Sequence, residues 1–140
     1  MWGSNMRQFT IPSGFSSNEE SHRYLFAQAM EISNDMTVIF DLEGRITFAN
    51  EACGRILGCR ATALVGSFLW DVIADLDQIG GILESSLLYG QWKGEVSFRH
   101  KSGESVAIRL RTVLIQAKDG EILGIVGVGW DLTSQNEFEE

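Results

Sequence analysis

The pattern of apolar and polar positions predicts one long helix at the start of the chain and a run of strands at its end. Over residues 19–32 apolar side chains recur three and four positions apart, which is typical of an amphipathic helix. Beyond residue 90 the period changes to two, over 92–99, 106–114 and 122–130, and glycine-containing turns separate these runs. We therefore expect three consecutive antiparallel strands in the second half.

Shorter elements fill the middle of the chain. Two β-type runs, 36–41 and 45–49, flank a glycine-containing turn and predict a hairpin. Asn50 is placed to cap a helix that extends through residue 57, and Gly58 suits its C-terminal end. Three further short helices are expected over 61–65, 68–76 and 80–88.

This order of elements predicts an α+β fold with one five-stranded antiparallel sheet, short helices over one face of it, and an additional N-terminal amphipathic helix. Residues 1–17 are rich in Gly, Ser and Asn and show no periodicity, so we expect a flexible tail. Residues 18–33 form the flanking helix and 34–133 the core. The polar residues 134–140 favour the start of another helix.

The last predicted strand is apolar on both faces. One face holds Ile125 and Gly127, and the other holds Val126, Val128 and Trp130. A strand of this kind belongs to a sheet that is covered on both sides. We expect the N-terminal helix, a partner subunit or both to cover the second face. The predicted homodimer interface consists of Leu25, Phe26, Ala29, Met30, Val126, Val128 and Trp130.

Length, composition and charge limit the function classes. The chain has 140 residues, 44% of them apolar, and a net charge of -8, which fits a single folded domain and disfavours nucleic-acid binding. Cys53 and Cys59 lack metal-like spacing, so we expect free thiols and no metal site. The apolar runs are too short to insert in a membrane, and no signal peptide is recognisable, so we expect a cytoplasmic location. Scattered carboxylates and two histidines offer no catalytic arrangement, so we expect no enzyme activity of this chain itself.

Five segments, taken in this order, resemble parts of a PAS domain, a small sensory module. They are Asp-Leu-Glu-Gly-Arg-Ile-Thr-Phe-Ala-Asn (41–50), similar to the first hairpin; 51–58, similar to the helix after it; Ala-Thr-Ala-Leu-Val-Gly-Ser-Phe (61–68); 92–104, similar to the third strand and its turn; and Asp-Leu-Thr (131–133), similar to the terminal motif. The sequence departs from the family at 74–78, where Ala-Asp-Leu-Asp-Gln replaces a common His-Pro-Asp type of segment.

The resemblance implies a sensory or dimerisation role within a larger signalling protein, such as a sensor histidine kinase, with the output domain on the same polypeptide. It also implies that flanking helices relay the signal. By analogy, Asp131 and Thr133 hold the start of the output helix against the end of the sheet, and Arg45 is a candidate partner of Asp131. The alternative is that Asp131 only caps the following helix.

Strand parity and the resemblance together predict which residues face a cavity between the sheet and its helices. They are Phe40, Phe48, Arg55, Ile56, Ile73, Leu83, Phe98, Ile108, Leu110, Thr112, Ile125 and Gly127. Arg55 and Thr112 are the expected contacts of a polar small-molecule ligand. The alternatives are that so apolar a lining is simply a packed core and that Thr112 forms a local hydrogen bond.

The first expectation for cofactors is that none is bound, because the known cofactor signals are missing. Gly66 is followed by Ser-Phe-Leu-Trp instead of the reactive-cysteine segment of photochemical flavin domains, and the helix before the third strand lacks an axial histidine for haem. A non-covalent flavin (FAD) stays open, with Trp70 and Trp92 stacking on its ring and polar groups of Asn50, Arg55, Ser86 and Thr112 at its edge. The alternative is that Trp92 belongs to the core and that Trp70 covers the contact between two helices.

Two functions follow from the sequence. The first is a ligand-sensing module with a small molecule in the apolar cavity. The second is a ligand-free module for dimerisation and signal relay, with a filled core.

Overall fold

A computed structural model of the chain describes residues 25, 28–29 and 34–132. The chain divides into two units, Met1–Met30 and Glu31–Glu140. The strands and the helices α3 to α6 all belong to the second unit. In chain order they are β1 (Met36–Phe40), β2 (Ile46–Ala49), α3 (Glu51–Leu57), α4 (Ala61–Leu64), α5 (Leu69–Val72), α6 (Asp77–Tyr89), β3 (Gln91–Arg99), β4 (Ser105–Gln116) and β5 (Ile122–Asp131).

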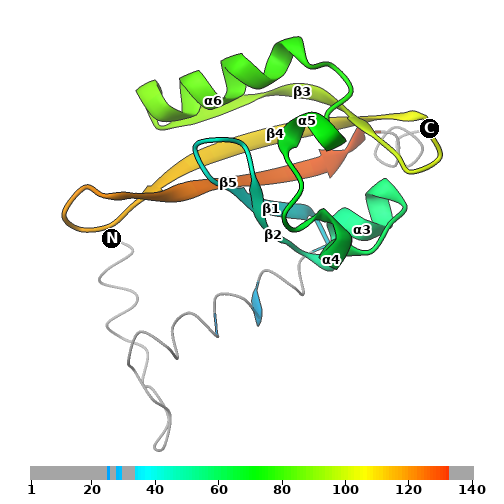
Figure 1. The fold of residues 1–140 in the computed structure, drawn as a ribbon, viewed down its shortest axis with the longest axis horizontal. Helices are drawn as coiled ribbons and strands as arrows, with labels where there is room; N and C mark the ends of the chain where they lie inside the picture. Colours follow the sequence, from blue (N-terminus) through cyan, green and yellow to red (C-terminus); the bar gives the residue numbers. More distant parts are fainter. Residues whose placement is uncertain (1–24, 26–27, 30–33, 133–140) are drawn as a thin grey trace, which may run out of the picture. The chain divides into compact units, whose positions relative to one another are not determined.

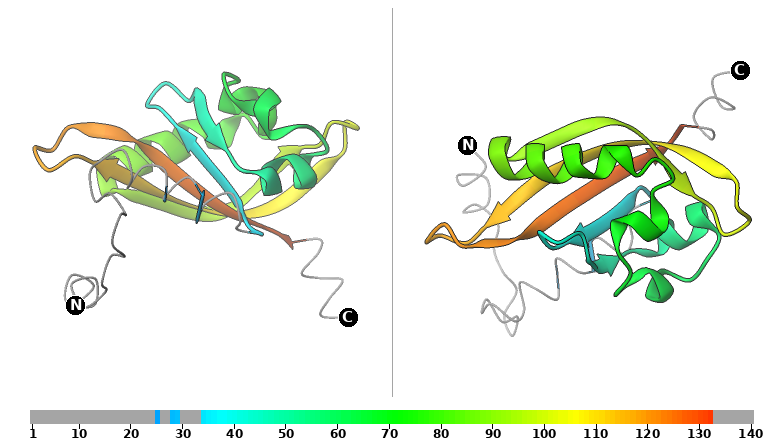
Figure 2. Two further views of the ribbon diagram at one scale, coloured as in Figure 1. Left: turned by 90° about the horizontal axis from the view of Figure 1, so that it is seen from below. Right: turned by 45° about the horizontal axis from the view of Figure 1, so that its top comes forward.

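The five strands form one antiparallel sheet in the order β2-β1-β5-β4-β3 (Figure 1). The chain enters the sheet at β1 and returns to its neighbour with β5, so the first and last strands of the domain pair in the middle of the sheet. Helices α3 to α6 lie over one face (Figure 2). The predicted fold class is therefore confirmed for this unit.

The first hairpin closes by local hydrogen bonds that the sequence supplies. One side-chain oxygen of Asp41 accepts hydrogen bonds from the backbone amides of Glu43 and Arg45, both at 2.9 Å. Gly44 has a φ of 88°, a left-handed conformation that glycine adopts without steric cost. This Asp-x-x-Gly turn fixes the start of β2 relative to β1.

The helical middle differs from the prediction in two places. The predicted helix over 68–76 is reduced to α5, because Ile73 instead forms an isolated bridge with Phe98 of β3. Helix α6 begins at Asp77, three residues before the predicted start at Gly80, and includes both Gly80 and Gly81. Burial of Ile79 and Ile82 on the sheet side outweighs the helix propensity that the two glycines lose, about 1 kcal/mol each.

The segment between α4 and α6 also covers part of both edges of the sheet. On the β2 edge, Ile46 donates to the carbonyl of Ser67 at 2.7 Å and accepts from Gly66 at 2.8 Å. On the β3 edge, the amide of Ala74 donates to the carbonyl of Ser97 at 2.7 Å. Edge strands with unpaired backbone groups can pair with other chains, so these bonds protect both edges where they occur.

The predicted flanking helix lies largely outside the described residues. Residues 25, 28 and 29 are helical and exposed, whereas Phe26 and Met30 of the predicted interface are not described. The tail 1–17, Thr133 and the predicted linker 134–140 also lie outside the described residues.

Candidate functional site

The space between the sheet and its helices, predicted to be a ligand cavity, is filled by side chains. Seven of the predicted cavity residues are buried at 3% exposure or less: Phe40, Ile73, Phe98, Ile108, Leu110, Thr112 and Ile125. The remaining hollow among the core residues, which Phe98 helps to line, has a volume of about 10 Å³ and an apolar lining. This volume approaches that of a single water, whereas small-molecule sites measure roughly 300–1,000 Å³.

The glycine in the middle of β5 does not leave room either. A methyl group on Gly127 would lie 3.2 Å from a methyl of Val38 and 3.3 Å from one of Leu110. These neighbouring side chains already fill the space above the glycine. Gly127 is therefore a close-packing position of the core.

Thr112 forms a local hydrogen bond, which was the alternative to its predicted role as a ligand contact. Its hydroxyl lies 2.5 Å from the hydroxyl of Ser86 on α6, and both residues are fully buried. Ser86 donates its own proton to the carbonyl of Ile82 at 2.6 Å. Because a hydroxyl has one proton, Thr112 is the donor of the pair. This chain of two bonds connects α6 to the middle of the sheet.

Four other predicted cavity residues occupy different surroundings. Ile56 and Leu83 are half-buried and pack against the core. Arg55 is exposed on α3. The placement of Phe48 on the cavity side is wrong, because its cross-strand partner is Ile39, and Ile39 faces outward beside Val126. A bulge in β2 adds one residue, Thr47, between partners and reverses the parity.

The pairing of Arg45 with Asp131 is also wrong. Arg45 follows the turn at one end of β1, and its guanidinium lies 4.8 Å from the centre of the Phe68 ring. Asp131 follows Gly129, which pairs with Met36 at the other end of β1. Five residues of extended strand, roughly 16 Å, therefore separate the two positions. The two side chains are held at opposite ends of the sheet.

Asn50 has a larger structural role than the cap that the sequence predicted. Its side-chain oxygen accepts from the amides of Thr37 at 3.0 Å and Cys53 at 3.3 Å, and its amide group donates to the carbonyl of Asp35 at 2.9 Å. Asn50 is fully buried. Asn50 therefore ties the start of α3 to the place where the chain enters β1.

The thiol of Cys53 belongs to the same cluster. It donates to the carbonyl of Thr37 at 3.3 Å, and burial raises the pKa of this thiol above its usual value. Cys59 is half-buried, and both cysteines are free. Among the described residues, no group of His, Cys, Asp and Glu side chains could hold a metal ion.

The two tryptophans considered for a flavin differ in position. Trp92 packs against the core from β3. Trp70 is 45% exposed on α5 and stacks on Phe68, with ring centres 4.2 Å apart and planes inclined by 9°. Trp70 therefore lies at the surface, stacked on Phe68, and does not line the core.

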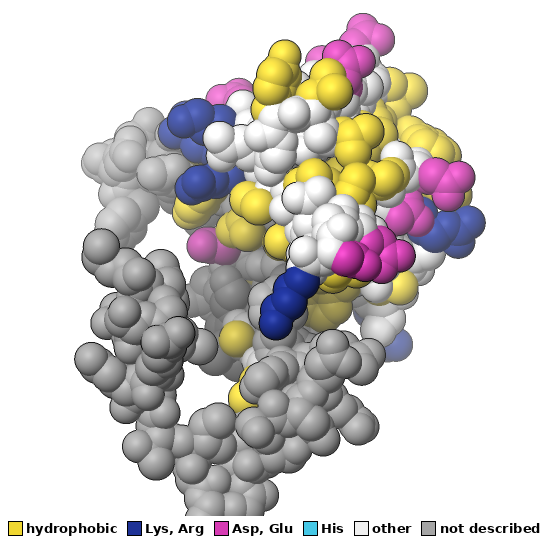
Figure 3. All heavy atoms as spheres, turned by 90° about the vertical axis from the view of Figure 1, so that its left-hand side faces the viewer, with side chains coloured by type: hydrophobic (Ala, Val, Ile, Leu, Met, Phe, Trp, Pro, Cys, Tyr) yellow, Lys and Arg dark blue, Asp and Glu magenta, His cyan; other side chains and the backbone are white. Residues whose placement is uncertain are grey.

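The outer face of the sheet, opposite the helices, is apolar along its centre. We call this surface the outer patch; it consists of Ile39, Phe48, Val113, Ile115, Val126, Val128 and Trp130. Val113, Ile115 and Trp130 are exposed by 40%, 37% and 42%. Further apolar side chains gather where α6 ends, at Leu87, Leu88 and Tyr89, and Figure 3 shows that end of the molecule.

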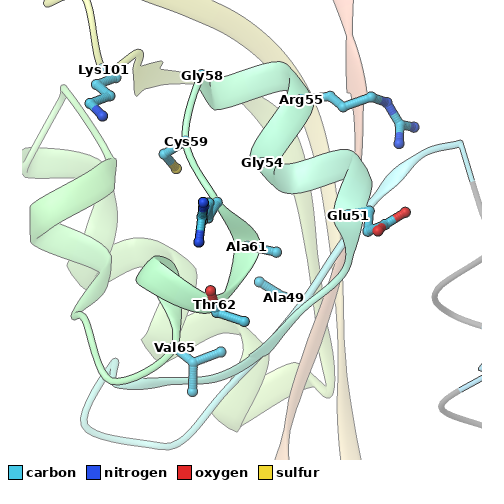
Figure 4. A pocket seen from close by; sticks show the side chains of 11 residues that line it. Ala49, Glu51, Gly54, Arg55, Gly58, Cys59, Ala61, Thr62, Val65 and Lys101 are labelled. Atoms are coloured by element: carbon cyan, nitrogen blue, oxygen red, sulfur yellow. The ribbon is translucent and has the colours of Figure 1, made fainter.

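A surface groove that no sequence pattern predicted lies beside α3. It has a volume of about 850 Å³ and is lined from α3, α4 and the hairpin between β3 and β4 (Figure 4). Its cationic residues are Arg55, Arg60 and Lys101. Lys101 follows Arg60 by 41 positions, so only the folded chain brings it to the same groove as the two arginines.

Comparisons with known proteins agree with this geometry. The family model described as PAS fold matches residues 30–137, and the chain therefore belongs to this family. A PAS domain from Colwellia psychrerythraea is 23% identical, with a TM-score of 0.72, over 81% of this chain and 98% of that one. No curated protein sequence matches the chain.

Two further solved structures show the same fold. A domain of a sensory box sensor histidine kinase/response regulator from Geobacter sulfurreducens is 18% identical, with a TM-score of 0.65, over 82% of this chain and 98% of that one. The PAS domain of a LuxR-family transcriptional regulator from Burkholderia thailandensis, in complex with ethanol, is 15% identical with a TM-score of 0.65, over 77% of this chain and 97% of that one.

The helices in the described part of the chain lack the combined length and apolar character needed to cross a membrane.

Proposed function

We propose that this chain is a regulatory PAS module of a larger cytoplasmic signalling protein, and that it relays a signal by association through the outer patch. The observation that supports this proposal is the filled core. The hollow that the described core residues line measures about 10 Å³, so a ligand there would have to displace packed side chains. The module itself carries no catalysis in this proposal, and the output domain follows on the same polypeptide.

The outer patch supplies the apolar surface that association needs. Val113, Ile115 and Trp130 stay partly exposed on it, and contiguous exposed apolar surface marks interaction sites. Beside it lie Arg109, which pairs with Trp130 across the strands, and Arg111, which pairs with Val128. An apolar centre with charged residues at its margin is the usual composition of a protein interface. A second copy of this chain is the proposed partner, with the flanking segment 18–33 completing the interface.

The substitution Trp130→Glu tests the proposal, with Trp70→Glu as its matched control. Both tryptophans are exposed to a similar extent, 42% and 45%, but only Trp130 lies in the outer patch. We expect the wild-type protein and Trp70→Glu to be dimers in sedimentation equilibrium and Trp130→Glu to be a folded monomer. A monomeric wild type, or a Trp130→Glu dimer of unchanged affinity, would contradict the proposal.

The second candidate function is sensing of a small molecule in the core. The ethanol complex of the LuxR-family relative favours it, together with the buried hydroxyl pair of Ser86 and Thr112, which offers hydrogen-bonding groups inside an apolar core. Native mass spectrometry and an absorbance spectrum of the purified protein test it. A bound molecule or a flavin band that disappears in Gly127→Leu would favour this second function over the relay module.

A further inference from the structure

The groove beside α3 is a larger hollow than the space in the core. Its volume of about 850 Å³ lies in the range of small-molecule sites, roughly 300–1,000 Å³. Ala49, Gly54 and Ala61 supply small apolar surfaces, and Val65 extends them along one side. Figure 4 shows Cys59, Ala61 and Thr62 between Gly58 and Val65, within the groove.

The charge of this groove opposes the charge of the chain. Arg55, Arg60 and Lys101 line it, although the whole chain carries a net charge of -8. None of these cations forms an ion pair with a carboxylate in the part of the chain that the structure describes. The lining includes the carboxylate of Glu51, which has an interaction of its own. In Figure 4, Glu51 and Arg55 lie on the side away from Cys59 and Lys101. We therefore assign ligand contacts to the other two cations that line the groove, Arg60 and Lys101.

Backbone contacts hold the walls of the groove in place. The amide of Lys101 donates to the carbonyl of Leu57 at 2.9 Å, which attaches the hairpin between β3 and β4 to the end of α3. A methyl group on Gly58, whose φ is 77°, would collide with the ring of His100. A methyl group on Gly54 would collide with the carbonyl of Cys59 at 2.5 Å. The glycines therefore permit the close approach of these segments, and the bond to Leu57 fixes the backbone of Lys101 beside the end of α3.

We propose that this groove binds a small organic dianion with an apolar body, such as an aromatic dicarboxylate. Arg60 and Lys101 pair with its acidic groups, and Ala49, Ala61 and Val65 contact the apolar body. The class of ligand follows from the lining: unpaired cations select negative charge, and the small apolar side chains that line the same groove disfavour a fully hydrated inorganic anion. The site is on the helix side of the molecule and is independent of association through the outer patch.

Isophthalate is a suitable probe, with its neutral diamide, isophthalamide, and inorganic sulfate as comparison ligands. We expect isophthalate to shift the backbone amide signals of Gly58 and Thr62 in a two-dimensional NMR titration of the full chain, and the other two compounds to cause no shifts at the same concentration. Equal shifts with isophthalamide would overturn the role of charge. Equal shifts with sulfate would overturn the role of the apolar body.

Two hairpin lysines provide a matched pair of variants. Lys101 and Lys118 are both exposed, and both stand in Lys-x-Gly-Glu turns, but only Lys101 lines the groove. We expect Arg60→Gln and Lys101→Gln each to weaken isophthalate binding by about three- to tenfold, as expected for a lost charge-assisted hydrogen bond at an exposed site. Lys118→Gln should change it by less than about twofold, because it alters the net charge alone. Equal losses for Lys101→Gln and Lys118→Gln, or no binding by the wild type, would refute the site.

Discussion

The two faces of the sheet are built from alternate residues of the same strands, yet they meet different surroundings. On β4, Ile108 and Leu110 face the helices and are almost completely buried, whereas Val113 and Ile115 face outward and keep more than a third of their surface exposed. On β5, Ile125 is buried and Trp130 is exposed. On β5 both faces are apolar, so side-chain chemistry alone does not separate them on that strand.

This difference assigns separate roles to the two faces. The helix-covered face is closely packed, and its buried hydroxyls and amides have hydrogen-bond partners, which leaves no buried polar side-chain atom without a partner among the described residues. Such a core stabilises the domain and leaves little space for a ligand. The outer face keeps apolar surface that a second copy can bury, and that surface is the basis of the proposed relay.

The largest expected effect separates the two faces directly on β4. Ile108→Ala should lower the free energy of unfolding by about 2–5 kcal/mol, because it creates a cavity in a closely packed core. Ile115→Ala should lower it by less than about 1 kcal/mol, because that side chain is already partly exposed. Urea unfolding of the two variants measures both values, at a protein concentration where the wild type is monomeric. Similar losses would mean that the outer patch is covered within one chain.

The next effect concerns the hydrogen bonds that join the helix layer to the sheet. Asn50→Ala should cost about 2–4 kcal/mol, because it removes the cap of α3 and leaves the buried amide of Thr37 without its acceptor. Asn34→Ala, at an exposed position nearby, should be almost neutral and is the control for losing an asparagine. A loss for Asn50→Ala as small as that of the control would show that the cluster does not stabilise the domain.

A smaller loss of unfolding free energy is expected at the buried hydroxyl pair, and it should differ between the two residues. Ser86→Ala should cost about 1–3 kcal/mol, because it leaves the donor of Thr112 without an acceptor. Thr112→Val should cost less than about 1 kcal/mol, because Ser86 keeps its bond to the carbonyl of Ile82. In the double variant most of the Ser86→Ala loss should be recovered. Equal losses in the two single variants would reverse the assigned donor.

The smallest expected effect is on the reactivity of the two thiols, and it can be measured on the wild-type protein. Burial raises the pKa of Cys53, so less of its thiolate is present at a given pH, and thiolate is the species that reacts. With iodoacetamide under native conditions, mass spectrometry should find alkylation at the half-buried Cys59 and not at Cys53. Alkylation of Cys53 at a comparable rate would show that the core opens far more readily than its packing implies.

Much of the fold could be predicted from local patterns. Period-two alternation located β3, β4 and β5, and the glycine turns located their hairpins, because each depends on neighbouring residues only. Parity failed at Phe48, and the failure comes from a β-bulge between β1 and β2. A bulge is a property of the pairing between two strands, so one strand's sequence does not show it.

For the candidate sites, the sequence identified single residues, whereas their contacts depend on the fold. The sequence identified Thr112 as the polar residue of an apolar face, but its hydrogen bond to Ser86 depends on where α6 crosses the sheet. The family analogy made Arg45 a candidate partner of Asp131, although β1 holds the two at opposite ends. The sequence did not find the groove of Arg60 and Lys101, whose residues lie about forty positions apart and meet only where the hairpin attaches to α3.

The strand alternation, the turns and the membership of the family could be predicted without coordinates, because they depend on the order of residues along the chain. The tertiary structure decided whether the core is open, which face Phe48 occupies and where unpaired cations converge. The physical reason is that these properties depend on packing and pairing between distant segments, whose side chains compete for the same space. In this protein side chains fill the core, whereas the outer patch and the α3 groove stay accessible to a partner or a ligand.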